Sequence, residues 1–348
     1  MKAQPTLDRA AGSERLLVVD PSCGCWATAA MDALVLATRP GDLVVLNDAA
    51  TLPASLSART PDGEPVELRL LEAPRDGAVQ VALLGAGDWR TPTERRPPAP
   101  LLVRGDRLFL GDDEVRVEHV GGRLARIRFH GLDPWAVIYR HGRPVQYSYM
   151  ADDVPLAAVQ TAFATRPWAA EMPSAARPLT WRTLLALRRR GVRLATLTHG
   201  AGLSSIDGGH LDRALPLPEW SDIPARTVRA IRQTRAAGGR ILAVGTTVTR
   251  ALEGRIHAAG RLEPGEARTD LILTPDYAPR LVDGLLSNIH LPGESHFELM
   301  SAWAPSDVLA AANATAEQRG FRAHEFGDAT LILGGSLADI GAEGCVAA

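Results

Sequence analysis

Lysine is almost absent from the chain, because Lys2 is the only lysine and arginine supplies all the other fixed positive charges. A Schiff base with a carbonyl substrate, an anchor for pyridoxal phosphate and a phosphate-binding P-loop each require a lysine in the site. The scarcity excludes these three kinds of chemistry. A site that needs a fixed positive charge has to obtain it from arginine.

Cysteine is also in short supply, and Cys23, Cys25 and Cys345 are the complete set. Three cysteines are too few for a disulfide scaffold, and their spacing lacks the paired pattern of a zinc site. We therefore expect no bound metal. We interpret Cys23 and Cys25 as bystander thiols beside a turn, and a redox or metal role for this pair is the weaker alternative.

A signal peptide and a long apolar run are missing as well. The first twelve residues are polar, and Arg, Gly or Pro interrupts the later apolar runs. A helix that spans a bilayer needs about 20 consecutive apolar residues. We expect a soluble, cytoplasmic protein without a membrane partner, and no feature of the sequence indicates an oligomeric state.

The chain lacks a strong net charge, at −2 with an isoelectric point near 6.5. Proteins that bind nucleic acid without specificity usually present a basic face, so the balance argues against that function. Specific binding of a tRNA stays open, because the arginines could gather on one side. With 348 residues, of which 46% are hydrophobic, the chain can bury a large core and is long enough for two domains.

Two different patterns of secondary structure alternate along the sequence. Residues 15–19 and 42–46 have the apolar character of buried strands, and residues 29–38 between them are predicted as a helix. Short, partly alternating runs without helices follow, which is typical of a small antiparallel barrel or sandwich. These predicted strands cover residues 66–71, 79–84, 101–103, 107–110, 114–119, 124–129 and 135–139.

Helical periodicity returns in the second half of the chain. The predicted helices cover residues 154–164, 181–190, 225–237, 247–258, 297–302 and 306–319, and the predicted strands between them cover residues 192–197, 240–244, 270–273 and 330–333. Alternating strands and helices indicate an α/β fold. We predict a main α/β domain, formed by residues 1–57 and 148–348, with an inserted small antiparallel β-barrel-like domain of residues 58–147.

The most informative local feature is a strand, turn and helix around residue 245. Residues 241–244 are predicted as a buried strand, and Thr246 or Thr247 is expected to cap a helix that begins at Val248 and carries Arg250. The first turn of such a helix leaves backbone N–H groups directed at one place, where a carboxylate or phosphate can bind. In open α/β sheets, ligands collect beyond the carboxyl ends of the strands.

Two sequence blocks, residues 241–250 and 281–296, occur in an order that resembles the S-adenosylmethionine:tRNA ribosyltransferase-isomerase family of queuosine biosynthesis. The resemblance extends over nearly the whole chain, through shorter blocks at residues 15–20, 40–47, 110–113, 269–275 and 326–332. It implies the same α/β arrangement with an inserted β domain. It also implies that S-adenosylmethionine is a co-substrate, whose ribosyl moiety moves to a 7-aminomethyl-7-deazaguanine in tRNA with release of adenine and methionine.

The chain departs from the family pattern at several motifs. Ala50 and Ser55 stand where the family carries two arginines, and residues 170–178 replace the family motif Ala-Ala-Pro-Thr-Ala-Gly-Leu-His-Phe. A family histidine is displaced by one position to His199, and Glu219 alone is kept from a His-Ser-Glu motif. The departures favour an alternative in which the donor is kept and a small molecule replaces tRNA, either by transfer or by simple cleavage. A non-catalytic binding protein is the third hypothesis.

The chemistry of the donor defines the catalytic residues to look for. The sulfonium acidifies the adjacent ribose carbon, so a general base could remove its proton, adenine would leave, and a nucleophile would capture the sugar before methionine departs. The candidate bases are His199, Glu171 and His290. His199 opens a glycine-containing loop and His290 follows a Leu-rich segment, so each could instead be a structural histidine, and Glu171 could belong to an exposed charged loop.

The same crevice supplies the expected substrate contacts. We expect Gly245, Thr246 and Thr247, together with Arg250 or Arg177, to bind the methionine carboxylate. Asn47 and Asp328 are expected to contact the ribose or adenine, although either could simply belong to a turn. The remaining predicted binding residues border the same loops: Ser174, Asp48, Gly200, Gly202 and Glu294.

Overall fold

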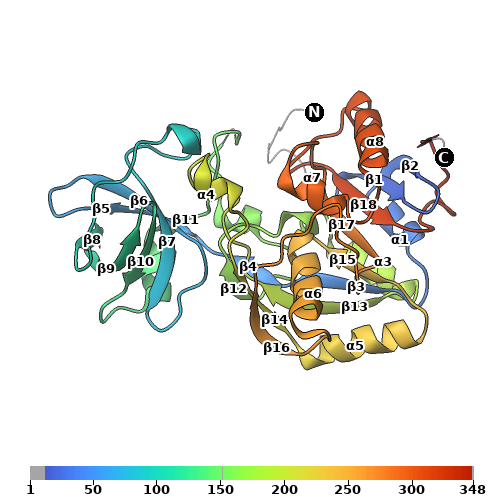
Figure 1. Cartoon of the computed structure of the whole chain (residues 1–348), viewed down its shortest axis with the longest axis horizontal. Helices are drawn as coiled ribbons and strands as arrows, with labels where there is room; N and C mark the ends of the chain where they lie inside the picture. Colours follow the sequence, from blue (N-terminus) through green and yellow to red (C-terminus); the bar gives the residue numbers. More distant parts are fainter. Residues whose placement is uncertain (1–11, 151, 347–348) are drawn as a thin grey trace.

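The computed structural model describes residues 12–150 and 152–346, which form a large mixed sheet covered by helices and a separate small barrel (Figure 1). Lys2 lies outside the described residues. The large sheet has ten strands in the order β16 (Gly265–Thr269), β14 (Glu219–Ile223), β13 (Arg193–His199), β3 (Leu43–Asn47), β15 (Ile241–Val244), β17 (Gly284–Asn288), β18 (Ala329–Leu333), β1 (Arg15–Asp20), β2 (Cys25–Ala30) and β19 (Gly344–Cys345).

Four neighbouring strands at the centre of this sheet run parallel. Strand β3 pairs in parallel with β13 on one side and β15 on the other, and β15 pairs in parallel with β17. Their carboxyl ends therefore meet at one edge of the sheet. Strand β18 runs antiparallel to β17, so its first residue lies at the same edge. This carboxyl edge positions the candidate site described below.

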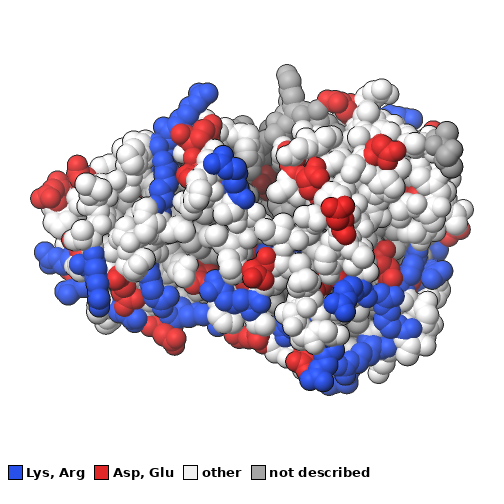
Figure 2. Space-filling model, in the orientation of Figure 1, with Lys and Arg blue, Asp and Glu red and all other residues white. Residues whose placement is uncertain are grey.

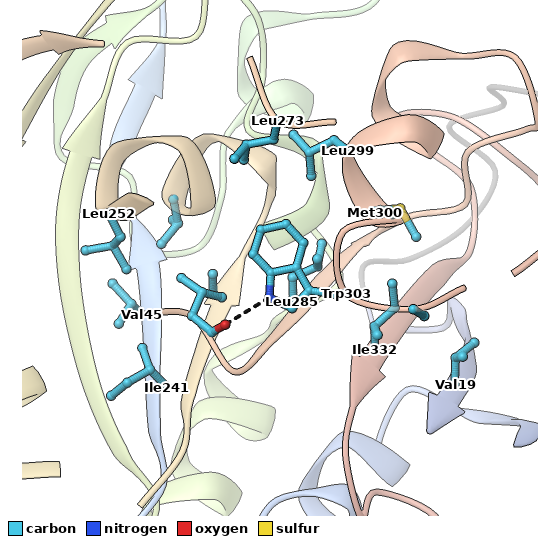
Figure 3. Packing of buried hydrophobic residues seen from close by; sticks show 14 of the residues in the cluster. Val19, Val45, Ile241, Leu252, Leu273, Leu285, Leu299, Met300, Trp303 and Ile332 are labelled. Carbon is cyan, nitrogen blue, oxygen red and sulfur yellow. Dashed lines mark hydrogen bonds between the residues drawn. The ribbon is translucent and has the colours of Figure 1, made fainter. Parts of the chain in front are cut away.

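Both faces of the central strands β3, β15, β17 and β18 are buried, which explains the continuous apolar runs of these strands. On one face, Leu43 and Val45 join the core beneath α5 (Ala225–Ala236), α6 (Thr246–Ala259) and α8 (Ser306–Gln318), and Figure 3 shows part of this packing. On the other face, Val44 and Leu46 pack beneath α1 (Ala33–Ala37) and α3 (Trp181–Arg189). The alternation of these side chains follows directly from the period of two in a strand.

The second sheet closes into a six-stranded antiparallel barrel. Its strands follow the order β5 (Ser55–Arg59), β6 (Pro65–Leu70), β7 (Ala78–Leu84), β10 (Leu124–Arg128), β9 (Asp113–Gly121) and β8 (Arg107–Leu110). Pairing of Arg59 with Phe109 joins β8 back to β5 and closes the ring, and the short β11 (Gly142–Arg143) adds to β5. The predicted α/β fold with an inserted barrel-like unit is confirmed. The division at residues 58 and 147 stays a prediction.

Short elements complete the described structure. They comprise β4 (Ala49–Thr51), which pairs in parallel with β12 (Arg166–Ala169), the helices α2 (Pro134–His141), α4 (His210–Arg213) and α7 (Ser295–Met300), and the 3-10 turns η1 (Thr93–Arg95), η2 (Leu156–Val159) and η3 (Ser174–Ala176). No helix in residues 12–150 and 152–346 is long and apolar enough to cross a bilayer.

Several predicted elements were wrong. Residues 135–139 belong to helix α2 because Asp133 accepts a hydrogen bond from the Trp135 N–H as its cap and Pro134 occupies the first turn. Residues 101–103 form no strand. The expected helix over residues 154–164 is reduced to η2, which directly follows Pro155. Residues 29 and 30 end β2, so α1 begins later than predicted.

Two further predictions need correction at the margins of the large sheet. Strand β16 ends at Thr269, where its register with β14 ends, so residues 270–273 lie outside the sheet. Cys25 is not a bystander thiol: it forms a disulfide with Cys345, which β19 brings opposite it, whereas Cys23 is free and exposed. The sequence separation of 320 between the bonded cysteines concealed the pair in the sequence.

Trp303 provides a test of the core packing beneath the helices. Its side chain is 9% exposed, and its Nε1 donates to the backbone oxygen of Val282 at 2.9 Å. We expect Trp303→Phe to lower the free energy of unfolding by about 1 to 2 kcal/mol, because a buried carbonyl loses its donor. Trp181→Phe is the matched control, since Trp181 is 59% exposed. Equal denaturant midpoints for both variants would contradict this account.

Candidate active site

A cavity of about 410 Å³ opens at the carboxyl edge of the large sheet. Its lining comes from the segment that follows the barrel, from the loops around residues 171–175 and 201–205, from the start of α6, and from residues 287–296 and 324–326. A cavity of this size, lined by apolar groups with a few polar side chains, is typical of a small-molecule site.

The amino-terminal end of α6 faces this cavity. Gly245 precedes the helix with φ of 91°, a backbone conformation that favours glycine, and Gly245, Thr246 and Thr247 all belong to the lining. The helix begins at Thr246, two residues earlier than predicted, and no side chain caps it. The expected cap by Thr246 or Thr247 was wrong. The positive end of the helix dipole is therefore available to an anionic ligand.

Arg250, one turn into α6, adds a guanidinium to this end of the cavity. The residue is 5% exposed; its Nη1 is in close contact with the Glu219 carboxylate, and its Nε donates to the backbone oxygen of Leu271 at 3.1 Å. Its Nη2 is buried and has no hydrogen-bond partner in the part of the chain that the structure describes. A buried N–H donor normally has a hydrogen-bond acceptor. The Nη2 group can therefore donate to an acceptor that a ligand supplies.

Glu219 is the anion that holds this arrangement together. Besides Arg250, it accepts from His199 Nε2 at 2.8 Å and from the Gly202 N–H at 2.7 Å. Burial alone would raise its pKa, but the nearby His199 and Arg250 outweigh burial and lower the pKa of Glu219 to about 2. Glu219 is therefore ionised at neutral pH and acts as a fixed counter-ion rather than as a proton acceptor.

Two histidines and a glutamate lie beside this cluster. The rings of His290 and His296 are 4.7 Å apart between centroids, and His290 Nδ1 lies 3.7 Å from a Glu294 oxygen. Burial, followed by the neighbouring His290, lowers the pKa of His296 to about 3. His296 is thus a neutral imidazole, able to accept and donate hydrogen bonds at physiological pH.

Glu171 lies in a different environment on the cavity wall. It is in close contact with the Tyr147 hydroxyl, which donates to it, and it accepts from the Ser204 N–H at 2.9 Å. Burial raises the pKa of Glu171 to about 7, although the bonds from Tyr147 and Ser204 oppose the shift. A carboxyl group with a pKa near the working pH is suited to accept and return a proton.

A row of rings continues from Tyr147 along the cavity. Tyr147 and Tyr149 stack with centroids 5.8 Å apart, and Tyr149 stacks on His324 at the same distance. The Tyr149 hydroxyl donates to Glu325 Oε1 at 2.7 Å. His296, Tyr147, Tyr149, His324 and Glu325 all belong to the lining but were missed from the sequence. In the sequence, the spacing of two residues between Tyr147 and Tyr149, directly after the predicted barrel, was the only signal that could have indicated these lining residues.

The structure brings most of the predicted site residues together. The following members of the predicted set line the cavity: Glu171, His290, Gly245, Thr246, Thr247, Arg250, Ser174, Gly202 and Glu294. Ser174 donates its hydroxyl to Asn288 Oδ1 at 2.8 Å, which ties the loop that carries Glu171 to the end of β17. Glu294 is the residue before α7 but does not cap it with its side chain; it accepts instead from the Leu291 N–H.

Four other predicted residues lie behind the cavity wall rather than in it. His199 is fully buried, and within the described part of the chain its Nε2 bonds to Glu219 alone, so the expectation that it touches the substrate as a base is not supported. The Asn47 side chain donates to the His199 carbonyl oxygen and accepts from the His199 N–H, both at 2.9 Å. Asp48 accepts from the Thr198 hydroxyl at 2.6 Å. Gly200 packs against the backbone of Trp168. These residues join the ends of β3 and β13.

Arg177 and Asp328 are likewise placed away from the lining. Arg177 Nη1 is 2.6 Å from a Glu14 oxygen, and its guanidinium lies over the Phe326 ring. Asp328 is fully buried and accepts from the backbone N–H groups of Arg15 and Arg322, an arrangement that links the starts of β1 and β18. The predicted ligand contacts of Arg177 and Asp328 are therefore replaced by structural ones.

Among the described residues, no group of three or more His, Cys, Asp or Glu side chains is arranged to hold a metal ion. Several polar groups of the cavity, such as Glu171 and Glu219, are instead paired with other side chains and with backbone amides. The arrangement can bind an anion at the start of α6, and it can exchange a proton through Glu171.

The family of queuosine biosynthesis proteins matches residues 1–332. An S-adenosylmethionine:tRNA ribosyltransferase-isomerase of Trichlorobacter lovleyi is 32% identical and covers 92% of each chain, and one of Acaryochloris marina is 37% identical, covering 86% of this chain and 82% of its own. The crystal structure of the S-adenosylmethionine tRNA ribosyltransferase of Thermotoga maritima is similar with a TM-score of 0.51, 26% identity and 96% of each chain covered.

The raised pKa of Glu171 generates a test through stability. A carboxyl group whose pKa is higher in the folded state than in the unfolded state lowers the free energy of unfolding as the pH rises, because it must ionise in an unfavourable environment. We expect Glu171→Gln, which mimics the protonated form, to match the unsubstituted protein near pH 4.5. At pH 8.5 the variant should be more stable by about 1 to 3 kcal/mol. Denaturant unfolding at both pH values measures this; an equal difference at the two would contradict it.

Proposed function

The chain belongs to the family of queuosine biosynthesis proteins, and we propose that it is an S-adenosylmethionine:tRNA ribosyltransferase-isomerase. In this reaction the ribosyl moiety of S-adenosylmethionine moves to the aminomethyl group of a 7-deazaguanine in tRNA, and adenine and methionine are released. S-adenosylmethionine is consumed, so it is a co-substrate. A tRNA acceptor is consistent with a cytoplasmic protein, which we propose here.

The observation that carries this proposal is the anion site at the start of α6. The amino-terminal turn of the helix and the unpaired Nη2 of Arg250 converge on one end of the cavity. The methionine carboxylate of S-adenosylmethionine matches both groups, because a helix amino terminus and a guanidinium each favour a carboxylate. Binding there directs the sulfonium and the ribose toward the rest of the cavity.

Glu171 is the proton acceptor that the cavity supports best. It lines the cavity, unlike His199, and its pKa of about 7 leaves much of it ionised at neutral pH. The carboxylate would take the proton from the ribose carbon beside the sulfonium, after which adenine leaves. His290 also lines the cavity and is the second candidate. Ser204 and Tyr147 hold the Glu171 carboxyl in position through their hydrogen bonds.

Basic side chains on the molecular surface agree with a tRNA acceptor. On the face shown in Figure 2, arginines gather along the lower edge, over the barrel and around α5. Acidic side chains are interspersed among them, as the balanced net charge requires. Arginines of this kind can contact phosphates without making the protein a non-specific binder of nucleic acid.

A small-molecule acceptor is the second candidate function, and specific positions favour it. Ala50 and Ser55 lack the arginines of the resembled family, and Ser55 instead donates its hydroxyl to Glu67 at 2.8 Å inside the barrel. The changed segment around Glu171 and Ser174 forms part of the cavity wall itself.

The direct test is release of adenine and methionine from S-adenosylmethionine by the purified protein. With tRNA carrying 7-aminomethyl-7-deazaguanine, we expect both products and a modified tRNA, detected by chromatography and mass spectrometry. Adenine release that is unaffected by this tRNA would favour the small-molecule acceptor. Absence of turnover with tRNA and with free amines, together with absence of heat on calorimetric titration with S-adenosylmethionine, would contradict the proposal.

Substitution of Arg250 tests the anion site. We expect Arg250→Gln to weaken binding of S-adenosylmethionine by about 10- to 100-fold, because one charge-assisted hydrogen bond to the carboxylate is lost. Arg229→Gln is the matched control, since Arg229 is exposed on α5. Arg250→Lys keeps a charge near Glu219 and guards against a folding defect. Unchanged affinity for S-adenosylmethionine in both folded Arg250 variants would show that its methionine carboxylate does not bind at this end of the cavity.

A further inference from the structure

Arg69, on strand β6 of the barrel, is a buried cation that the site described so far does not use. At 1% exposed, it is the largest of the fully buried side chains among the described residues. Its Nε donates to Glu67 Oε1 at 2.7 Å, but its Nη1 is buried and has no hydrogen-bond partner in residues 12–150 and 152–346. A buried guanidinium with an unused donor costs free energy, so packing alone does not explain it.

Glu67 is shared by two guanidiniums. Besides Arg69, it accepts from Arg96 Nη1 at 2.6 Å, and Arg96 is 2% exposed. Asp88 also lies near Arg96, but its side chain is 54% exposed and pairs with Arg90 at 2.8 Å. Two buried guanidiniums against one buried carboxylate leave an excess of positive charge on this side of the barrel.

Arg69 reaches the cavity wall through Tyr147. Its guanidinium lies over the Tyr147 ring, 5.4 Å from the ring centroid, and the Tyr147 hydroxyl donates to Glu171. A cation over the face of a phenol ring attracts the ring electrons, which makes the hydroxyl a stronger donor. Burial lowers the pKa of Arg69, but Glu67, Tyr147 and Glu171 attract the guanidinium and raise it. Arg69 and Glu171 are therefore linked across one ring.

The other groups that face Glu171 differ in their effect on its ionisation. The N–H and the hydroxyl of Ser204, at 2.9 and 3.3 Å, favour the carboxylate. Burial and the neighbouring Glu325 oppose it and raise the pKa of Glu171. Tyr149 is neutral, because burial and Glu325 raise its pKa well above its usual value. Among these described groups, Arg69 is the fixed cation.

Position 55 gives a second, independent indication. Ser55 on β5 pairs directly with Arg69 on β6, so the two side chains lie on the same face of the sheet with Cβ atoms about 5 Å apart. Ser55 stands where the resembled family carries an arginine, and its hydroxyl donates to the same Glu67 oxygen as Arg69 Nε. A guanidinium from either strand can therefore reach Glu67.

We propose that Arg69 is a positioning residue: it holds Tyr147 against Glu171, favours the ionised form of that carboxyl group, and provides from β6 the guanidinium that the family provides from position 55 on β5. The inference rests on the proposed function, in which Glu171 is the proton acceptor. Arg69 lies outside the cavity lining and acts through Tyr147. The serine at position 55 therefore does not remove the positive charge from this part of the barrel.

Denaturant unfolding of the full-length protein measures the ionisation of Glu171 without turnover. The difference in midpoint between the protein and its Glu171→Gln variant should grow with pH and level off near pH 7, where Glu171 titrates. In an Arg69→Leu background, in which Arg96 still pairs with Glu67, we expect the levelling to move up by about one pH unit. In a background with both Ser55→Arg and Arg69→Leu, the levelling should return toward pH 7.

Two further variants keep this test decisive. Arg116→Leu is the matched control, because Arg116 is half-exposed and pairs with Glu114 elsewhere on the barrel; the levelling should stay near pH 7. Arg69→Gln is a second neutral variant, which can still donate to a carboxylate and guards against a folding defect of the leucine variant. An unchanged levelling pH in the folded neutral variants of Arg69, or no return on adding Ser55→Arg, overturns the proposal.

Adenine release separates failure of this inference from failure of the proposed function. The pH below which kcat/KM for adenine release falls should rise by the same interval in Arg69→Leu, without a change in KM for S-adenosylmethionine. A shifted unfolding profile without adenine release removes the proposed function and leaves the placement of Arg69. Adenine release with an unshifted pH profile in Arg69→Leu overturns the inference and leaves the proposed function.

Discussion

The buried carboxylate of Glu219 is the interaction on which the site depends. It connects β14 to His199 at the end of β13, to the N–H of Gly202 in the following loop, and to Arg250 in α6. Each partner comes from a different element, so one ionised group sets the spacing of the cavity wall. Because breaking a buried charge pair leaves an uncompensated charge, this network holds the guanidinium in place without a ligand.

The cavity uses carboxylates in two distinct ways, and the surroundings decide which. Glu219 contacts the Arg250 guanidinium and N–H donors, which keep its pKa at about 2, whereas Glu171 lies beside hydroxyl groups and another carboxylate, and its pKa is raised to about 7. Groups of the same chemistry whose pKa values are pushed apart in this way are typical of acid–base sites. His199 beside Glu219 is thereby a structural partner, and Glu171, which accepts from the Ser204 N–H, is the proposed proton acceptor.

Much of the fold was accessible from local patterns. The continuous apolar runs at residues 15–19 and 241–244 predicted strands buried on both faces, and the change to short alternating runs predicted the barrel. Errors arose where one local signal competed with another. The apolar run at 135–139 predicts a strand, but Asp133 and Pro134 start a helix there. The disulfide between Cys25 and Cys345 depends on the pairing of two strands from opposite ends of the chain.

The sequence by itself determined the central strands, the strand-to-helix turn at Gly245 and the family, because these depend on short blocks of residues close together in the chain. Only the tertiary structure decided which polar groups face the cavity. His199, Asp328 and Arg177 looked equivalent to Arg250 and Glu171 as charged or titratable groups near strand ends. Packing gave the first three their partners within the protein, whereas Arg250 Nη2 and Glu325 Oε2 have none among the residues that the structure describes, a difference that depends on neighbours far away in sequence.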